Sequence, residues 1–365
     1  MRESTNWIGF DEDASKVVVA RVVGYESKAR ESFTVEFNDR GLRQLVRRLK
    51  ELEGEVRCVY EAGGSGYELY RTLRRHGLAC EVAAPSLTPR KPGDRVKTNR
   101  RDAEKLATLY RGGDLTMISV PDQARESLRD LVRCREDAQQ DLLRQRNRLT
   151  KLLYRRGLRH GDGRRWTQSY WRWLRALRVA EPHLQTVIDE SILAIEHAVE
   201  RLRRVDLAVR QAAVEPPYKA MVGRLMTFRG VGALTAISII AELGDLRRFA
   251  QAKKLMAAVG VTPSEFSTGD HQRRLGITKT GNAHLRYLLV EAAWQARHRP
   301  SARGAILKRR AEQPPEVVEI ARRCEQRLHR KYSRMIHRGK PSSKAAVAVA
   351  RELLGFIWSV GQLPL

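Results

Sequence analysis

A pair of long helical segments in the middle of the chain limits the folds that are open to it. Residues 125–157 and 184–213 are highly charged, repeat their apolar residues with helical spacing and contain few helix breakers. Such segments are typical of an antiparallel helical pair or a coiled coil, so we expect a coiled-coil arm over residues 122–215. A solvated spacer and an element for dimerisation and nucleic-acid binding explain the pattern equally well.

The segment before the arm, residues 1–121, has a different pattern, in which short strands alternate with amphipathic helices. Strands are predicted within 7–22, 32–37, 55–61 and 79–85, and helices over 39–52 and 66–77 and from residue 102 onward. This alternation predicts an α/β domain in which helices cover a sheet.

The segment after the arm begins at the pair Pro216-Pro217 and is mostly helical. We expect a mainly α domain over residues 216–300 and a basic helical extension over residues 301–365. Within the arm, the tryptophan-rich stretch at 164–175 offers aromatic surfaces for stacking on unpaired bases, although packing at a helix corner explains it at least as well.

The charge of the chain points to a polyanionic partner. The formal net charge is +27 and the isoelectric point is about 10.6, which favours a nucleic acid. Neither a run of about 18 apolar residues nor the apolar core of a signal peptide is present, so we expect a cytoplasmic, nucleoid-associated protein. The four cysteines lack the C-x-x-C spacing of zinc sites and of redox motifs.

Three carboxylates are candidates for a metal site. Asp11 and Glu61 each end a predicted strand, and Asp102 opens a predicted helix. Acids at the ends of neighbouring strands converge in space, and three such oxygen ligands suit Mg²⁺ ions that hold phosphate oxygens. The alternative is that Asp11 and Glu61 are solvated strand-end acids and that Asp102 is a helix N-cap.

Two segments of the C-terminal half are candidates for phosphate binding. The turn "RGVG", with Arg229, Gly230 and Gly232, resembles a helix-hairpin-helix element, in which backbone amides approach a phosphate. A plain glycine turn between packed helices is the alternative. Further along, "PSEFSTGD" is predicted as a hydroxyl-rich loop next to polar and cationic side chains that suit a phosphate. These are Arg273, Arg274, Lys279, Asn282, His284 and Arg286.

The order of these motifs closely resembles that of the DEDD transposases of bacterial insertion sequences, the Piv-invertase-like family of bridge-RNA-guided serine recombinases. The resemblance spans nearly the whole chain and is carried by "GFDEDASK", "YEAGG", "RVKTNRRDAEKLA", "RGVGALTAISIIAELGDLRRF", "AVGVTPSEFSTGDHQRRLGITKTGNAHLR" and "ARELLGFIW". It implies a RuvC-like, RNase H-type domain, a coiled-coil arm and a C-terminal transposase domain that carries a catalytic serine.

The resemblance also assigns roles to single residues. Asp11, Glu61 and Asp102 match acids that bind Mg²⁺, and Asn99 stands where the family normally has a further acid. An amide oxygen contacts Mg²⁺ without contributing charge, so this departure either lowers metal affinity or shows that the position is dispensable. The catalytic serine corresponds to Ser267, with Thr268 as the alternative register and Ser264 as a third candidate.

Together these assignments imply one composite site. The carboxylates would hold metal against a phosphate, and Ser267 would attack that phosphate to form a covalent 5′ or 3′ phosphoserine link. The implied function is an insertion-sequence transposase that acts on donor and target DNA, is guided by a structured non-coding RNA and works as a homodimer or homotetramer. A RuvC-like Mg²⁺-dependent junction nuclease and a non-catalytic nucleic-acid-binding protein are the alternatives.

Overall fold

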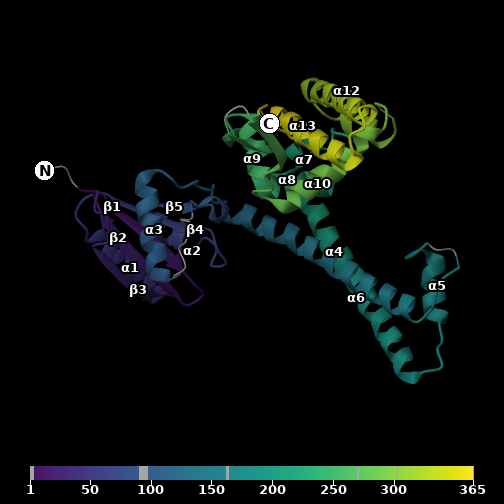
Figure 1. Ribbon diagram of the computed structural model, residues 1–365, viewed down its shortest axis with the longest axis horizontal. Helices are drawn as coiled ribbons and strands as arrows, with labels where there is room; N and C mark the ends of the chain where they lie inside the picture. Colours follow the sequence, from purple (N-terminus) through teal and green to yellow (C-terminus); the bar gives the residue numbers. More distant parts are fainter. Residues whose placement is uncertain (1–3, 90–97, 162–163, 269–270, 302, 365) are drawn as a thin grey trace. The chain divides into compact units, whose positions relative to one another are not determined.

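The computed structural model describes residues 4–89, 98–161, 164–268, 271–301 and 303–364. The chain forms two compact units, residues 1–121 and residues 122–365 (Figure 1). None of the described helices combines the length and the apolar character needed to cross a membrane. Part of the polar segment predicted between residues 86 and 101 lies outside the described residues.

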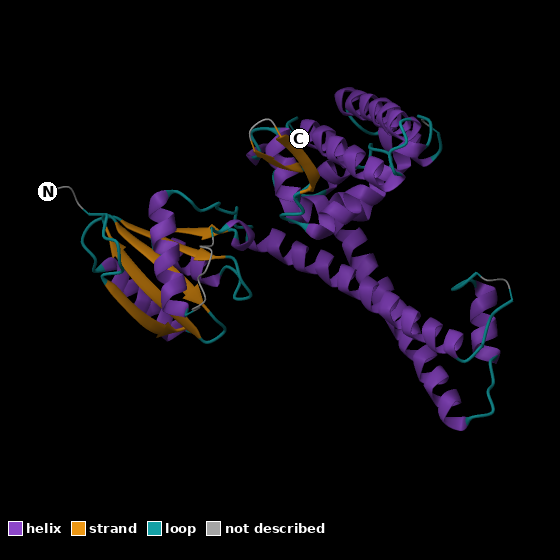
Figure 2. Cartoon of the chain, in the orientation of Figure 1, coloured by secondary structure: helices purple, strands orange, loops and turns teal. Residues whose placement is uncertain are grey.

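The N-terminal unit is built on one five-stranded sheet with the order β3-β2-β1-β4-β5. Its strands are β1 (Asn6–Glu12), β2 (Lys16–Val23), β3 (Glu31–Glu36), β4 (Val56–Glu61) and β5 (Ala79–Ala83). The first three form an antiparallel meander, whereas β4 and β5 run parallel to β1. The prediction of an α/β N-terminal domain is confirmed, and the sheet is drawn in orange in Figure 2.

Helices cover both faces of this sheet (Figure 1). On one face, α1 (Asp39–Lys50) and α2 (Glu68–Arg75) bury the larger core, in which Phe10 and Tyr60 are fully enclosed. On the other face lies α3 (Asn99–Gly112), which packs across β1, β2 and β4. A short 3₁₀ helix, η1 (Pro85–Leu87), follows β5. The sheet is thus the middle layer of a three-layer α/β unit.

The close approach of α3 to β1 depends on Gly9. A Cβ atom at this position would lie 2.0 Å from the carbonyl oxygen of Ala103 and 2.7 Å from the amide nitrogen of Ala107. Helix backbone and strand backbone are therefore in direct contact, which only a residue without a side chain permits.

Replacing Gly9 with alanine is expected to destabilise the N-terminal unit by about 1–3 kcal/mol, because α3 must shift away from the sheet. The measurement is urea unfolding of the full chain followed by circular dichroism. Gly64→Ala is the matched control, because a Cβ atom at Gly64 meets nothing within 4 Å. Equal stability of the two variants would contradict the packing argument.

Two helices of 33 residues each, α4 (Gln123–Arg155) and α6 (Pro182–Val214), form the arm. They run antiparallel, since Arg135 pairs with Asp206 while Arg201, earlier in α6, pairs with Asp141, later in α4. Between them, α5 (Gln168–Ala176) carries the aromatic cluster. Trp166 lies 5.2 Å from Tyr170 between ring centroids, and both pack on the arm's own core, which supports the helix-corner interpretation.

The remaining helices enclose one large core that also contains the base of the arm, including Leu128 of α4 and Val209 of α6. Residues 301–365, predicted as a separate extension, contribute side chains to this same core. The helices are α7 (Lys219–Leu225), α8 (Ala233–Leu243), η2 (Leu246–Arg248), α9 (Ala252–Val259), α10 (Ala283–Ala293), η3 (Trp294–Arg297), α11 (Ala305–Ala311), α12 (Pro315–His337) and α13 (Ser342–Gly361).

A β-hairpin interrupts this helical unit. Strand β6 (Pro263–Thr268) pairs antiparallel with β7 (His271–Ile277). The prediction of a loop over 263–269 is therefore wrong up to Thr268, and the basic run that follows is also a strand. Short alternating segments with exposed apolar side chains, such as Phe266, give too weak a pattern for a sequence-based strand assignment.

Candidate active site

Two of the predicted acids lie side by side on the sheet. In the parallel register of β1 and β4, Phe10 is opposite Tyr60, so Asp11 and Glu61 follow as neighbours at the ends of adjacent strands. Side chains alternate between the faces of a sheet, and Phe10 and Tyr60 face the core under α1 and α2. Asp11 and Glu61 therefore face the opposite side, which α3 covers.

The first turn of α3 reaches the same end of the sheet. Ala103 lies against Gly9, whereas Tyr110, near the end of α3, stacks edge-on against Trp7 with ring centroids 5.3 Å apart. Helix α3 thus runs antiparallel to β1, and its first turn, with Asp102, lies toward the Asp11 end of the strand. The backbone brings Asp11, Glu61 and Asp102 to one edge of the sheet.

The start of α3 differs from the sequence prediction. The helix begins at Asn99, and Thr98 is the N-cap residue, whose side chain accepts a hydrogen bond from the Arg101 amide at 3.4 Å. Asp102 is therefore not an N-cap, and the alternative interpretation of that residue is wrong. Asn99 and Asp102 lie one turn apart on neighbouring positions of a helix surface, with Asn99 exposed.

The donor set suits a divalent cation. Asp102 Oδ2 is buried and has no hydrogen-bond partner within the described part of the chain. An unpartnered buried carboxylate oxygen is costly, and a hard cation that accepts oxygen ligands would satisfy it. Among the described residues, no three His, Cys, Asp or Glu side chains lie close enough to hold a metal ion, so side-chain movement would have to complete the site.

Sequence reasoning missed Glu12, the acid directly after Asp11. Burial raises the pKa of Glu12 to about 7; a hydrogen bond from Ser65 opposes this rise, and the charge of Asp11 adds to it. Glu12 Oε2 is buried and has no hydrogen-bond partner among the described residues. Alternation with Phe10 would have identified this residue as the one acid on the enclosed face of β1.

The candidate nucleophile lies on the hairpin of the C-terminal unit. Ser267 is opposite Gln272, and Thr268 is opposite His271, in the register of β6 and β7. The hydroxyl of Ser264 donates to the Gly276 carbonyl at 2.8 Å, which ties it to the neighbouring strand. The placement of Gly269 and of the side chains of Ser267, Thr268 and Arg274 lies outside the described residues.

In the basic segment after Ser267, some side chains are exposed to solvent and others make contacts within the protein. Arg273 and Lys279 are exposed. Asn282 caps α10 by accepting a hydrogen bond from the Leu285 amide at 2.9 Å. Arg286 donates to the carbonyls of Val259 and Thr280, at 2.9 and 3.3 Å. His284 Nδ1 lies 3.5 Å from Glu136 Oε2.

The glycine turn before α8 has two different glycines. At Gly230, φ is +89° and a Cβ atom would lie 2.3 Å from the Ala292 carbonyl, so this residue serves backbone packing against α10. At Gly232, the N-cap of α8, a Cβ atom would meet nothing within 4 Å. Only the second glycine leaves the helix terminus accessible to an anion.

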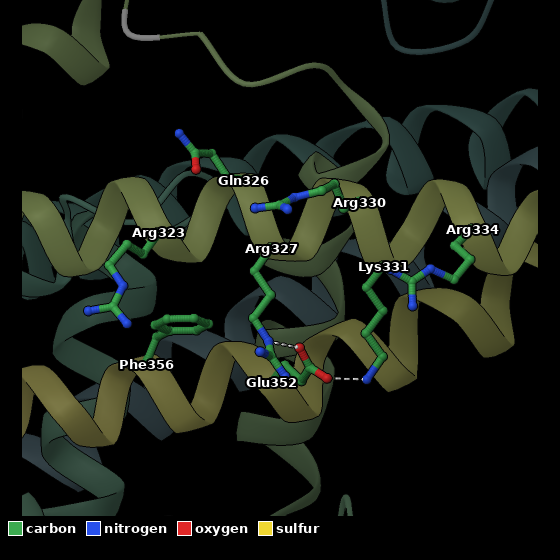
Figure 3. Close-up of a pocket in the computed structure, with 8 residues that line it drawn as sticks. All are labelled: Arg323, Gln326, Arg327, Arg330, Lys331, Arg334, Glu352 and Phe356. Atoms are coloured by element: carbon green, nitrogen blue, oxygen red, sulfur yellow. Dashed lines mark hydrogen bonds and ion pairs between the residues drawn. The ribbon is translucent and has the colours of Figure 1, made fainter.

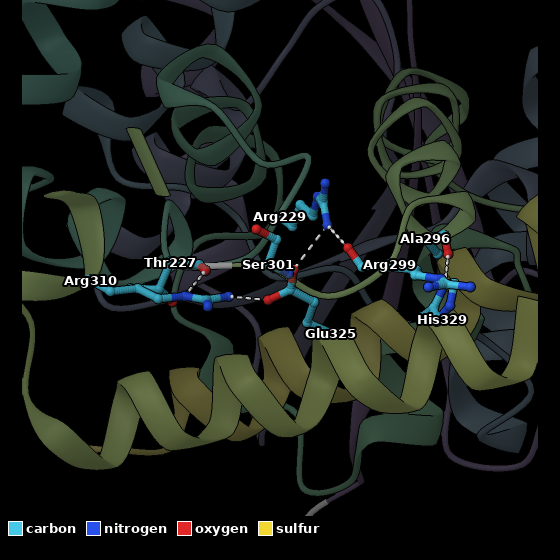
Figure 4. Close-up of polar contacts among 8 residues, drawn as sticks. All are labelled: Thr227, Arg229, Ala296, Arg299, Ser301, Arg310, Glu325 and His329. Atoms are coloured by element: carbon cyan, nitrogen blue, oxygen red, sulfur yellow. Dashed lines mark hydrogen bonds and ion pairs between the residues drawn. The ribbon is translucent and has the colours of Figure 1, made fainter. Parts of the chain in front are cut away.

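Arg229, the predicted phosphate ligand of this turn, is held by an internal network (Figure 4). Its Nη1 donates to the Arg299 carbonyl at 2.7 Å and to Glu325 Oε1 at 3.1 Å. Glu325 also pairs with Arg310, whose side chain is 4% exposed. The network connects the glycine turn to α12.

Glu325→Gln is expected to lower the free energy of unfolding of the C-terminal unit by about 3 kcal/mol, because it leaves the buried Arg310 guanidinium without a counter-charge. Urea unfolding of the full chain measures this loss. Glu319→Gln, an exposed position on the same helix, is the control and should be close to neutral. A neutral Glu325 variant would contradict the assignment.

Comparison with known proteins identifies the family. A sequence model described as "Transposase IS116/IS110/IS902 family" matches residues 222–306, and a DEDD transposase model of the IS110 type matches residues 8–156. A putative transposase of Sinorhizobium fredii, y4qE, is 39% identical over 90% of this chain and 81% of its own length. The chain belongs to the IS110 family of insertion-sequence transposases. The transposase of insertion sequence IS1533 from Leptospira borgpetersenii is 31% identical over 89% of this chain and 95% of its own length.

Membership in the IS110 family makes the chain an enzyme that cuts and rejoins DNA. DEDD transposases generally depend on a divalent metal, which agrees with carboxylates gathered at one edge of the sheet. The two matched regions contain Asp11, Glu61, Asp102 and the β6–β7 hairpin, but they end before α12 and α13.

Proposed function

We propose that this IS110-family transposase recombines DNA as a Mg²⁺-dependent serine recombinase guided by a bridge RNA. The observation that carries the proposal is the convergence of Asp11, Glu61 and Asp102 at one end of the α3-covered face, where Asp102 keeps an unpartnered buried oxygen. A bound Mg²⁺ would polarise the scissile phosphate and stabilise negative charge on its oxygens. Asn99, one turn from Asp102, is the proposed neutral ligand position.

In this mechanism Ser267 Oγ attacks the phosphorus and loses its proton to solvent. The bond from phosphorus to one deoxyribose oxygen breaks, and that oxygen takes up a proton. The strand then remains linked to Ser267 as a phosphodiester, 5′ or 3′. A hydroxyl of the new DNA partner attacks the same phosphorus and loses its proton to solvent, while Ser267 Oγ leaves and takes up a proton. Each step exchanges one phosphate ester for another, so no high-energy cofactor is required.

The charge of the chain supports the nucleic-acid partners. With a net charge of +27, the chain is suited to hold the backbones of donor DNA, target DNA and a structured guide RNA, while base pairing carries the sequence information. We propose two places where the protein contacts a phosphate backbone. One is the hairpin region, with the exposed side chains of Arg273 and Lys279, and the other is the accessible N-terminus of helix α8 at Gly232. Recombination of two duplexes needs several strand breaks, so we propose a homodimer or homotetramer assembled through the coiled-coil arm.

The test is to incubate the full chain with Mg²⁺, RNA transcribed from the flanks of its gene and DNA that carries the element junction. After denaturation, protein-linked DNA is isolated and the modified peptide is mapped. The expected result is an adduct on Ser267. An adduct on Thr268 or Ser264 would keep the mechanism and correct the residue. Cleaved DNA without an adduct would favour a water-using nuclease, and binding without cleavage would favour a non-catalytic protein.

A further inference from the structure

The C-terminal helices α12 and α13 line a groove of about 540 Å³ that lies outside both regions matched by the family models (Figure 3). Its lining is strongly basic. Five of the lining side chains are cations, Arg323, Arg327, Arg330, Lys331 and Arg334, against the single carboxylate of Glu352. A groove of this charge is suited to a polyanion.

The cations form one stripe along α12. Arg323, Arg327, Arg330 and Arg334 follow each other at intervals of four, three and four residues, which places them on one face of the helix. At a rise of about 1.5 Å per residue the stripe is about 16 Å long, so it is long enough to contact more than one phosphate of a single strand. The spacing therefore fits a nucleic-acid backbone that lies along the helix.

Part of the stripe is held in place before any ligand arrives. Glu352 of α13 accepts a hydrogen bond from Arg327 Nε at 2.8 Å and pairs with Lys331. Burial acts to raise the pKa of Glu352, but its contacts with Arg327 and Lys331 outweigh this effect and lower the pKa, so the carboxylate is ionised at neutral pH. Fixing two long side chains in advance reduces the entropy lost when a ligand binds.

The other three arginines remain available for a ligand. Arg323, Arg330 and Arg334 are exposed, and none of their guanidinium groups makes a hydrogen bond or an ion pair within the described part of the chain. Phe356 of α13 lines the groove between the two helices, where its half-buried ring faces the basic stripe (Figure 3). An aromatic ring beside cations is the arrangement that binds a backbone and stacks an unpaired base.

We infer that the α12–α13 groove is a second nucleic-acid site, which binds the sugar-phosphate backbone of a single-stranded segment and stacks a base on Phe356. DNA and RNA share this chemistry. The site does not depend on the metal and serine chemistry proposed above, because it uses neither the carboxylates of the sheet nor the hairpin. It would hold a strand while the catalytic residues act.

The test removes the three available charges in the full chain with the triple variant Arg323→Gln/Arg330→Gln/Arg334→Gln. Binding of labelled single-stranded DNA, RNA of the same sequence and duplex DNA is measured by fluorescence anisotropy over a range of salt concentrations. On a single strand, the slope of log affinity against log salt is expected to become shallower by about 2, because each lost phosphate contact contributes about 0.7. If the slope becomes shallower for single-stranded DNA alone or for RNA alone, that nucleic acid is the ligand, and the result supports the site.

The matched control is Lys308→Gln/Arg322→Gln/Lys344→Gln, which removes the same charge from exposed positions of α11, α12 and α13 outside the groove. It is expected to leave the slope within error of wild type. Phe356→Leu is expected to weaken single-strand binding at least about fivefold and to affect duplex binding little. Equal slopes for both triple variants, or an unchanged slope for the groove variant, would overturn the inference.

Discussion

Replacing Asp11 with asparagine is expected to reduce DNA cleavage at least about a thousandfold, since metal-ion stabilisation of a phosphoryl transition state amounts to several kcal/mol and each 1.36 kcal/mol is tenfold in rate. Asp11 is the acid that β1 places beside Glu61, on the face covered by α3. The substitution keeps the shape of the side chain and removes its charge. Cleavage is measured on junction DNA, and Mn²⁺ binding to the full chain is measured by calorimetry.

Asp13→Asn is the control for the Asp11 variant, because it removes the same charge two residues away. Asp13 is exposed and accepts hydrogen bonds from the amides of Ser15 and Lys16, at 2.7 and 2.8 Å, which shape the turn between β1 and β2. An asparagine oxygen can accept the same bonds. Cleavage and Mn²⁺ binding should therefore stay near wild type. If the Asp13 variant loses DNA cleavage and Mn²⁺ binding, or if the Asp11 variant retains them, the assignment of Asp11 is contradicted.

The fold of the N-terminal unit was predictable because each of its signals is local. The β-branched run of β2, the alternating apolar residues of β3 and the amphipathic spacing of α1 identify these elements directly. The close contact between Gly9 and Ala103 was not predictable, because it joins residues far apart in the sequence through backbone atoms. That contact nevertheless decides where the first turn of α3, and with it Asp102, meets the sheet.

The roles of residues in the C-terminal unit were harder to predict, because the sequence does not show whether a polar side chain binds a ligand or another part of the protein. Arg229, Asn282 and Arg286 were predicted as phosphate ligands, yet their side chains hold Glu325, the start of α10 and two backbone carbonyls. The basic stripe on α12 shows the reverse case. The spacing of its arginines can be read from the sequence, but their use as a binding site depends on Glu352 and Phe356 of α13, which line the same groove.

Replacing Ser267 with alanine is expected to abolish the protein–DNA adduct and to slow strand joining by at least about 10⁴-fold, as removal of a catalytic nucleophile does in other enzymes. Ser267 is a paired residue of β6, and its main-chain pairing with Gln272 does not involve the hydroxyl. The hairpin should thus survive the substitution. Adduct formation is measured on denaturing gels, and folding is checked by circular dichroism.

Two neighbouring variants decide whether the effect belongs to Ser267 itself. Ser264→Ala removes a hydroxyl that already donates to the Gly276 carbonyl, so it should weaken the hairpin slightly and leave the adduct intact. Thr268→Ala tests the other register, because the opposite faces of a strand carry residues 267 and 268. If Ser267→Ala still cuts DNA at the wild-type rate, water is the nucleophile and the carboxylates act without a serine. If only Thr268→Ala loses the adduct, the covalent mechanism holds and the hairpin presents its other face to the phosphate.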